Sequence, residues 1–249
     1  MNEGKKIAVV TGASSGIGAA TAQALAGAGF SLYLGARRLD RLREVAAPLG
    51  ATALELDVTD VDSIAAFAGQ LPGEIHLLVN NAGGAHGLDR IETASDEDWI
   101  VMWETNVLGV MRLTRALLPA IKASGDGHVV NIGSIAGFET YVGGGGYTAS
   151  KHAVRALTRT LRLELLGQPV RVTEVAPGLV GETEFSLVRF GGDAERARAV
   201  YRGLTPLTPE DVADSIVWAA TRPAHVNIDE IVLRPLDQAT STSVHRRES

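Results

Sequence analysis

Hydrophobic residues are arranged along this chain in short runs that alternate with longer segments of helical period. The runs consist mainly of valine, isoleucine and leucine, and they cover residues 7–10, 31–34, 52–56, 77–80, 128–132, 170–175 and 230–233. Strands that are apolar throughout are typical of a parallel sheet whose two faces are both covered by helices. The pattern therefore predicts an α/β protein with a doubly wound, parallel sheet of about seven strands.

The chain shows no sign of division into domains. No Pro/Ser-rich or charge-rich linker interrupts it, so we expect a single domain over residues 1–249. Right-handed crossovers would place the loops that follow the strands at one edge of the sheet, where ligands bind. A polar stretch at 182–204, with Gly191-Gly192 as its hinge, is expected to form a lid over a substrate. An ordinary surface excursion is the alternative.

Two segments carry more apolar residues than one buried face needs. One spans residues 99–121, and the other is the helix that begins near Tyr147. Surplus apolar faces on two helices predict a symmetric helix-to-helix interface, and hence a homodimer or homotetramer. Complete burial of these helices within one subunit explains the pattern equally well.

Composition narrows the classes of function. The formal net charge is −6 and the basic residues are scattered, which argues against nucleic-acid binding. The absence of cysteine excludes disulfides and thiol chemistry, and the six histidines show no metal-ligand spacing, so no metal is expected. No apolar run approaches the length of a membrane span or a signal-peptide core. We therefore expect a cytoplasmic protein without membrane contact.

A glycine-rich loop follows the first predicted strand. It reads Thr11-Gly-Ala-Ser-Ser-Gly-Ile-Gly18 and leads into a helix of small residues. Glycines permit a tight turn and close backbone approach, and the helix N-terminus presents unpaired N–H groups to a pyrophosphate. The position between a strand and a helix therefore favours dinucleotide binding. The loop residues assigned to the cofactor are Gly12, Ser14, Ser15, Gly16, Ile17 and Gly18.

The same loop contains the Gly-x-Ser-x-Gly elbow of serine hydrolases, from Gly12 to Gly16. That interpretation would make Ser14 a nucleophile, with Asp211 and His225 as partners in the required order. Only one strand precedes the elbow, however, whereas a hydrolase needs earlier strands to supply its second oxyanion donor. Dinucleotide binding is therefore the favoured interpretation, with the hydrolase as its rival.

Tyr147 and Lys151 are four residues apart in a predicted helix, and so lie on one face of it. There the ammonium is expected to stabilise the phenolate and to lower a phenol pKa that is about 10 in model peptides. A phenol tuned in this way can give or take a proton near neutral pH. The pair predicts an acid/base site rather than a non-catalytic nucleotide sensor, since binding alone needs no such phenol.

Further polar motifs follow the successive strands. They are Asp57-Val58, Asn80-Asn-Ala-Gly83, Asn106, Ser134, Tyr147-x-x-x-Lys151 and Pro177-Gly178-Leu-Val180. Together with the glycine loop, this ordered set resembles the short-chain dehydrogenase/reductase family over nearly the full chain. The resemblance implies a Rossmann fold and hydride transfer between a nicotinamide and a small carbonyl or alcohol substrate.

The resemblance also implies roles for single residues. Ser134 would donate a hydrogen bond to the substrate oxygen, Lys151 would bind the nicotinamide ribose, and Asn106 would hold a water that relays protons to solvent. With Tyr147 as acid/base, these four form the predicted catalytic set. Beyond the glycine loop, the predicted cofactor residues are Arg37, Arg38, Asp57, Val58, Asn81, Ala82, Gly83, Tyr147, Lys151, Pro177, Gly178, Val180 and Thr183. Thr183 is displaced from the family's threonine position, because Gly181 and Glu182 precede it.

NADP is the predicted cofactor, because of the residues that follow the second predicted strand. NAD-specific folds usually end this strand with Asp or Glu, which repels a 2′-phosphate. Here the chain reads Leu34-Gly-Ala-Arg37-Arg38, so the carboxylate is absent and two guanidinium groups stand next to its place. Some NADP-using relatives carry a basic residue where this chain has Ser14. The preference therefore depends mainly on Arg37 and Arg38.

Residues 170–235 and the terminal Val244-His-Arg246 resemble a narrower subgroup, the NADP-dependent 3-hydroxy acid dehydrogenases that act on serine, allo-threonine and related acids. Such a substrate needs a cation for its carboxylate, and Arg189 in the predicted lid is the candidate. A general aldehyde/ketone reductase is the alternative, with Arg189 as a solvated lid residue.

Overall fold

The computed structural model describes residues 4–247, which contain one seven-stranded sheet with every strand pair parallel. The strand order is β3-β2-β1-β4-β5-β6-β7. The strands are β1 Ile7–Thr11, β2 Ser31–Ala36, β3 Thr52–Glu55, β4 Leu77–Asn80, β5 Gly127–Ile132, β6 Val170–Pro177 and β7 Glu230–Leu233. The doubly wound Rossmann fold predicted from the hydrophobic runs is confirmed. The order reverses between β1 and β4, so the ligand-binding edge is expected there.

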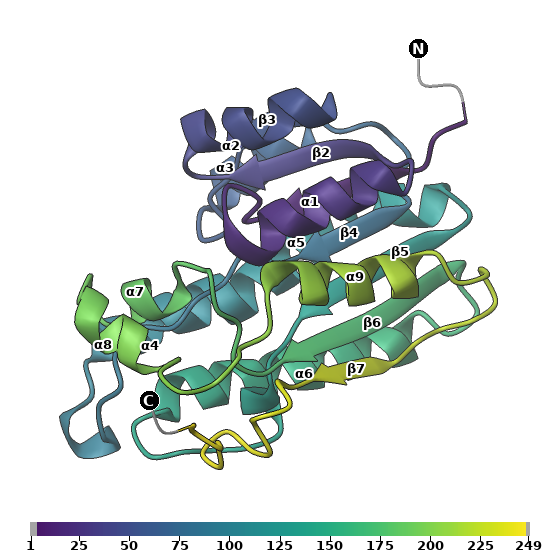
Figure 1. Cartoon of the computed structure of the whole chain (residues 1–249). Coiled ribbons are helices and arrows are strands. Elements are labelled where there is room, and N and C mark those ends of the chain that lie inside the picture. The colour runs from purple at the N-terminus through teal and green to yellow at the C-terminus, as the bar shows by residue number, and fades with distance from the viewer. Residues whose placement is uncertain (1–3, 248–249) are drawn as a thin grey trace.

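Nine α-helices connect these strands within the described residues. They are α1 Gly16–Gly27, α2 Leu39–Ala46, α3 Val61–Ala68, α4 Asp96–Trp103, α5 Gly109–Ala123, α6 Gly145–Glu164, α7 Phe185–Arg189, α8 Ala194–Ala199 and α9 Pro209–Ala220. Figure 1 shows α7 and α8 together at one end of the molecule, away from the helices that cover the sheet. The predicted lid segment therefore carries two short helices of its own.

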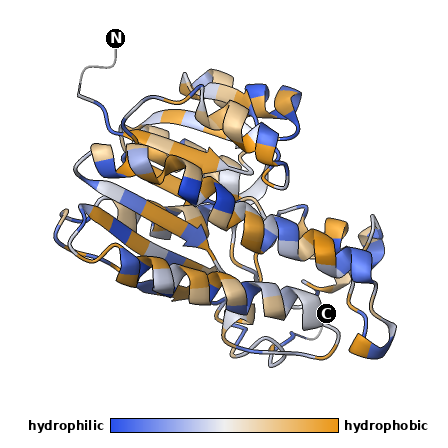
Figure 2. Ribbon diagram, turned by 180° about the vertical axis from the view of Figure 1, so that it is seen from behind, coloured by the Kyte–Doolittle hydropathy of each residue, from blue (hydrophilic) through white to orange (hydrophobic). Residues whose placement is uncertain are grey.

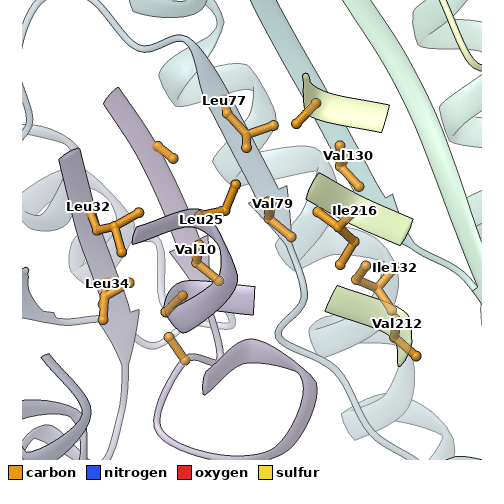
Figure 3. Close-up of a cluster of buried hydrophobic side chains, with 14 of the residues drawn as sticks. Val10, Leu25, Leu32, Leu34, Leu77, Val79, Val130, Ile132, Val212 and Ile216 are labelled. Carbon is orange, nitrogen blue, oxygen red and sulfur yellow. The ribbon is translucent and has the colours of Figure 1, made fainter. Parts of the chain in front are cut away.

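The sheet separates two hydrophobic layers. On one face α1, α2 and α9 pack against alternate strand residues, among them Val10, Val79 and Ile132 (Figure 3). On the other face α3, α5 and α6 pack against the intervening residues, such as Val9, Leu78 and Val129. Figure 2 shows the hydrophobic colour concentrated on the strands in the middle of the sheet. Burial on both faces explains why these strands are apolar throughout.

The segment 99–121 is not one continuous α-helix. A π-helical turn, Glu104–Leu108, separates α4 from α5 and contains the buried Asn106. Such turns occur frequently at functional sites. Along α4 the side chains of Trp99, Ile100 and Trp103 are exposed and not buried within the subunit. The homodimer or homotetramer stays a prediction. No helix among residues 4–247 has the length and apolar character that a membrane span requires.

Candidate active site

The glycine-rich loop connects β1 to α1 at the point where the strand order reverses. Gly12 has φ +63°, and a Cβ there would lie 2.9 Å from the Cα of Ala82. A Cβ on Gly18 would lie 2.4 Å from the carbonyl oxygen of Gly12. A larger residue at either position would push the loop away from its neighbours. Glycine therefore permits the close packing that a dinucleotide-binding loop requires.

The loop after β4 is hydrogen-bonded to Thr11, at the start of the glycine loop. Its Oγ1 accepts hydrogen bonds from the backbone N–H of Asn81 (3.0 Å) and of Ala82 (2.9 Å). The Asn81 side-chain amide donates back to the Thr11 carbonyl at 2.8 Å. Sequence reasoning did not single out Thr11, although it opens the glycine motif. These bonds bring two sets of predicted cofactor residues, the glycine loop and 81–83, to one edge of the sheet.

Arg38 lies against the same loop from the end of β2. Its Nη2 donates to the Oγ atoms of Ser14 (3.3 Å) and Ser15 (2.9 Å), and to the Glu184 carboxylate at 2.6 Å. Arg41 donates to the other Glu184 oxygen at 2.7 Å. Hydrogen bonds from the two arginines lower the pKa of Glu184 to about 2. Neither Glu184 nor Arg41 was predicted from the sequence, because each shows only one charge on a polar surface helix or loop.

Arg37 and Asp57 behave differently from Arg38. The exposed Arg37 side chain makes no hydrogen bond or ion pair within residues 4–247. Asp57 Oδ1 accepts hydrogen bonds from the N–H and the hydroxyl of Thr59, and so stabilises its own turn. Val58 lies against Gly109, since a Cβ added to that glycine would be 2.9 Å from Val58 Cγ2. Cofactor contact by these three residues stays a prediction.

Tyr147 lies in the first turn of α6 and is buried. The preceding glycines let the helix begin close to its neighbours, since a Cβ on Gly144 would lie 2.3 Å from the Tyr141 ring and one on Gly146 2.5 Å from Met102 Cε. The Phe185 ring from α7 packs edge-on at 5.5 Å between centroids. The glycine run 143–146 therefore serves the placement of the phenol.

The Lys151 ammonium is directed at a backbone carbonyl rather than at the phenol. Its Nζ donates to the Ile132 oxygen at 2.8 Å and lies 5.8 Å from the centroid of the Tyr147 ring. Burial lowers the pKa of Lys151 to about 8. Burial also raises the pKa of Tyr147 above its ordinary value, and hydrogen bonding to Ser134 opposes this only in part. The expectation that Lys151 lowers the phenol pKa is thus not met in this structure, because desolvation is the larger effect.

Ser134 begins the short turn after β5, in extended backbone conformation. Its Oγ accepts a hydrogen bond from the Ala136 N–H at 3.1 Å and donates to the Pro177 carbonyl at 3.5 Å. Because it also hydrogen-bonds the phenol of Tyr147, Ser134 connects the ends of β5 and β6 to the start of α6. The structure therefore brings Ser134, Tyr147 and Lys151 together, as predicted.

Asn106 has its side-chain amide fully engaged. The Nδ2 donates to the Gly84 carbonyl (2.9 Å) and to Ser150 Oγ (3.0 Å), while the Oδ1 accepts from the Gly84 N–H (2.9 Å). Both N–H groups of the amide are therefore used within the protein and neither is available to a relay water. The role of Asn106 in proton transfer stays a prediction.

The segment after β6 leads from the catalytic residues to the glycine loop. Gly178 donates its N–H to Leu233, and the buried Val180 forms an isolated bridge with Leu207. Thr183 lies over the glycine loop, where its Cγ2 would be 3.3 Å from a Cβ on Gly16. The displaced threonine is therefore at the predicted cofactor face.

A narrow pocket lies over Tyr147, and a wider cavity of about 260 Å³ shares five of its lining residues. The shared residues are His86, Gly87, Asp89, Asp98 and Arg189. Arg189 Nε donates to the Gly87 carbonyl at 3.1 Å, and its guanidinium carbon lies 5.7 Å from the centroid of the Tyr147 ring. Its Nη2 is buried and has no hydrogen-bond partner within residues 4–247. An unpaired cationic donor therefore lines the pocket of the predicted acid/base.

The hydrolase interpretation fails on geometry. Ser14 Oγ contacts the Arg38 guanidinium, and no histidine hydrogen-bonds to it within the described chain. The Asp211 carboxylate accepts from the Thr208 N–H in the capping box of α9, while the exposed His225 follows the far end of that helix. The two proposed partners are thus not brought to Ser14.

A glycine-rich loop at the strand reversal, with a buried tyrosine and lysine of α6 beside the end of β5, is the arrangement expected of a nucleotide-dependent oxidoreductase. The family model for short chain dehydrogenases matches residues 6–189. The chain belongs to this family.

Known relatives cover nearly all of the chain. The chain is 58% identical over 238 residues to an uncharacterized oxidoreductase of Mycobacterium tuberculosis. This match covers 96% of this chain and 94% of the relative. The chain is 42% identical over 247 residues to the NADP-dependent 3-hydroxy acid dehydrogenase YdfG of Escherichia coli, covering 97% and 100%. A solved structure, the closed form of serine dehydrogenase complexed with NADP⁺, is 42% identical with a TM-score of 0.92, covering 97% and 100%.

Proposed function

We propose that this enzyme transfers a hydride between NADP(H) and the hydroxyl-bearing carbon of a small 3-hydroxy acid. The observation that carries the substrate class is Arg189, whose buried Nη2 is unpaired beside Tyr147. A guanidinium binds a carboxylate through two parallel hydrogen bonds. A hydroxy acid held there would have its hydroxyl within reach of the phenol. The similarity to a 3-hydroxy acid dehydrogenase and to serine dehydrogenase supports the same class.

The cofactor is NADP. The group formed by Arg38, Arg41 and Ser15 already binds an anion, the Glu184 carboxylate. Arginine and hydroxyl donors suit a phosphate equally well, so this part of the chain fits the 2′-phosphate of NADP. The glycine loop and the start of α1 would hold the pyrophosphate.

The chain's own residues would handle the proton while the bound nicotinamide supplies or accepts the hydride. Ser134 and Tyr147 would both hydrogen-bond the substrate oxygen. Because burial keeps the phenol protonated at neutral pH, Tyr147 is prepared to donate a proton to a carbonyl oxygen during reduction. In the opposite direction the nearby positive charge of Arg189 would favour loss of that proton. We further propose that residues 182–204 close over the substrate as a lid.

Substitution of Arg189 tests the substrate class. Arg189→Ala should lower kcat/KM for 3-hydroxy acids by about 10- to 100-fold, because a charge-assisted hydrogen bond contributes roughly 1.5–3 kcal/mol. Neutral alcohols of similar size should be affected far less. The control is Arg198→Ala, an exposed arginine of α8 that lines neither pocket. Equal losses on acids and neutral alcohols would refute the hydroxy acid proposal and favour a general carbonyl reductase.

A further inference from the structure

The carboxyl group of Glu174 is buried near Lys151 and has no role in the mechanism described above. Glu174 is in the middle of β6 and its exposed fraction is 0%. Neither of its side-chain oxygens has a hydrogen-bond partner within residues 4–247. Buried polar groups are nearly always hydrogen-bonded, and a buried charge without a partner is costly. The position therefore calls for a physical reason.

Strand geometry directs Glu174 toward α6. It has the same parity along β6 as Val170 and Val172, which pack in the layer beneath α5 and α6. On the side of β6 that pairs with β5, Glu174 lies beside Gly133, the residue that follows β5. A Cβ on Gly133 would lie 2.1 Å from Glu174 Oε1. Any residue other than glycine at 133 would displace the carboxyl. Gly133 thus makes room for Glu174 immediately before the catalytic Ser134.

The Glu174 carboxyl and the Lys151 ammonium both lie against the peptide unit that joins Ile132 to Gly133. Lys151 Nζ donates to the carbonyl oxygen of Ile132, and the Glu174 carboxyl lies against the adjoining Gly133. The two groups interact electrostatically, since Glu174 raises the pKa of Lys151 against the effect of burial. Glu174 supplies the charge that opposes desolvation of the ammonium.

Other charges surround Glu174 but are bound elsewhere. Arg155 and Arg159 of α6 form ion pairs with Glu230 of β7, at 3.0 Å each. Glu230 is opposite Glu174 in the parallel register of β6 and β7. Burial, followed by the charge of Glu230, raises the pKa of Glu174 to about 7, while Lys151, Arg155 and Arg159 oppose the rise. Glu174 therefore changes charge near neutral pH.

We propose that Glu174 is a positioning residue that maintains the charge on Lys151. The proposal depends on the assignment of Tyr147 and Lys151 as the acid/base pair. A carboxylate behind the ammonium keeps Lys151 protonated to higher pH than a lysine buried alone. Removal of Glu174 should lower the pH at which Lys151 loses its proton.

The test compares pH profiles of kcat/KM for NADPH-dependent carbonyl reduction in wild type and Glu174→Gln. The alkaline limb should move to lower pH by about one unit, the size of shift that a nearby charge causes. The control is Glu164→Gln, which removes an exposed carboxylate at the C-terminal end of α6. An unchanged limb in Glu174→Gln, or an equal shift in Glu164→Gln, overturns the proposal. Failure of the acid/base assignment itself would show separately, as activity retained in Tyr147→Phe.

Thermal unfolding gives a readout that needs neither cofactor nor turnover. Because the folded-state pKa of Glu174 is raised from 4.5 to about 7, its ionisation destabilises the fold as pH rises through that range. The melting temperature of Glu174→Gln should equal that of wild type below pH 4.5 and exceed it above pH 7. A melting difference that does not change with pH would contradict a titrating Glu174. Should Glu174→Gln fail to fold, Glu174→Met removes the charge with a side chain of similar length and should move the kinetic limb in the same direction; an unchanged limb overturns the proposal.

Discussion

The two ends of the active-site cleft use ionisable groups in opposite surroundings. At the catalytic end Tyr147, Lys151 and Glu174 are at most 9% exposed, and burial is the largest cause of each pKa shift. At the end where adenosine is predicted to bind, the Arg38 and Glu184 side chains are 44% and 38% exposed. There the largest cause of the Glu184 shift is hydrogen bonding to Arg38.

This contrast explains what each end does well. A buried group exchanges its proton in a medium where one added or removed charge has a large effect, so it suits proton transfer. An exposed cluster is screened by water and salt, and it binds an anion without a large desolvation cost. Substitutions at the buried end should therefore change rates strongly, while those at the exposed end should change affinity more modestly.

The largest expected effect is at the buried end. Tyr147→Phe removes only the hydroxyl group that carries the transferable proton, because the ring keeps its contact with Phe185. Turnover should fall by about 10²- to 10⁴-fold, the usual contribution of general acid–base catalysis. NADPH binding, measured by fluorescence titration, and the melting temperature should stay near wild type. Near-normal turnover would show that the buried phenol is not the acid/base.

An intermediate effect is expected from the arginines at the end of β2. Arg38→Ala and Arg37→Ala should each weaken NADP by about 10- to 100-fold in kcat/KM, because each loses a charge-assisted hydrogen bond to the 2′-phosphate. NAD, which lacks that phosphate, should be nearly unaffected. Steady-state kinetics with both cofactors check this. A wild type that prefers NAD, or variants that lose both cofactors equally, would contradict the assignment.

The smallest expected effect comes from Glu184, which occupies the anion site of Arg38 and Arg41. Glu184→Gln should tighten NADP binding by at most about fivefold, because an exposed ion pair contributes only ~0–1 kcal/mol. The difference should shrink with added salt. Glu182→Gln, an exposed neighbour, is the control. Weaker binding in Glu184→Gln would mean that the carboxylate assists closure over the cofactor instead of competing with it.

Much of this molecule could be predicted from the sequence. All seven strands match the hydrophobic runs to within a few residues, because strands buried on both faces must be apolar along their whole length. The glycine loop and the Tyr147–Lys151 pair are equally legible, since each is a local pattern within one loop or one helical turn. Fold class, family and the candidate catalytic tyrosine and lysine follow from such local signals.

Only the tertiary structure decided which distant charges meet. Glu184 reaches Arg38 across 146 positions, and Glu174 meets Gly133 from the neighbouring strand. Neither glutamate carries a sequence signal, because a single carboxyl in a strand or loop has no characteristic spacing. The sign of the Tyr147 pKa shift was also undecided: the nearby lysine predicted a lowered value, whereas complete burial raises it. The sequence specifies which groups can ionise, but the dielectric around each group depends on the packed fold.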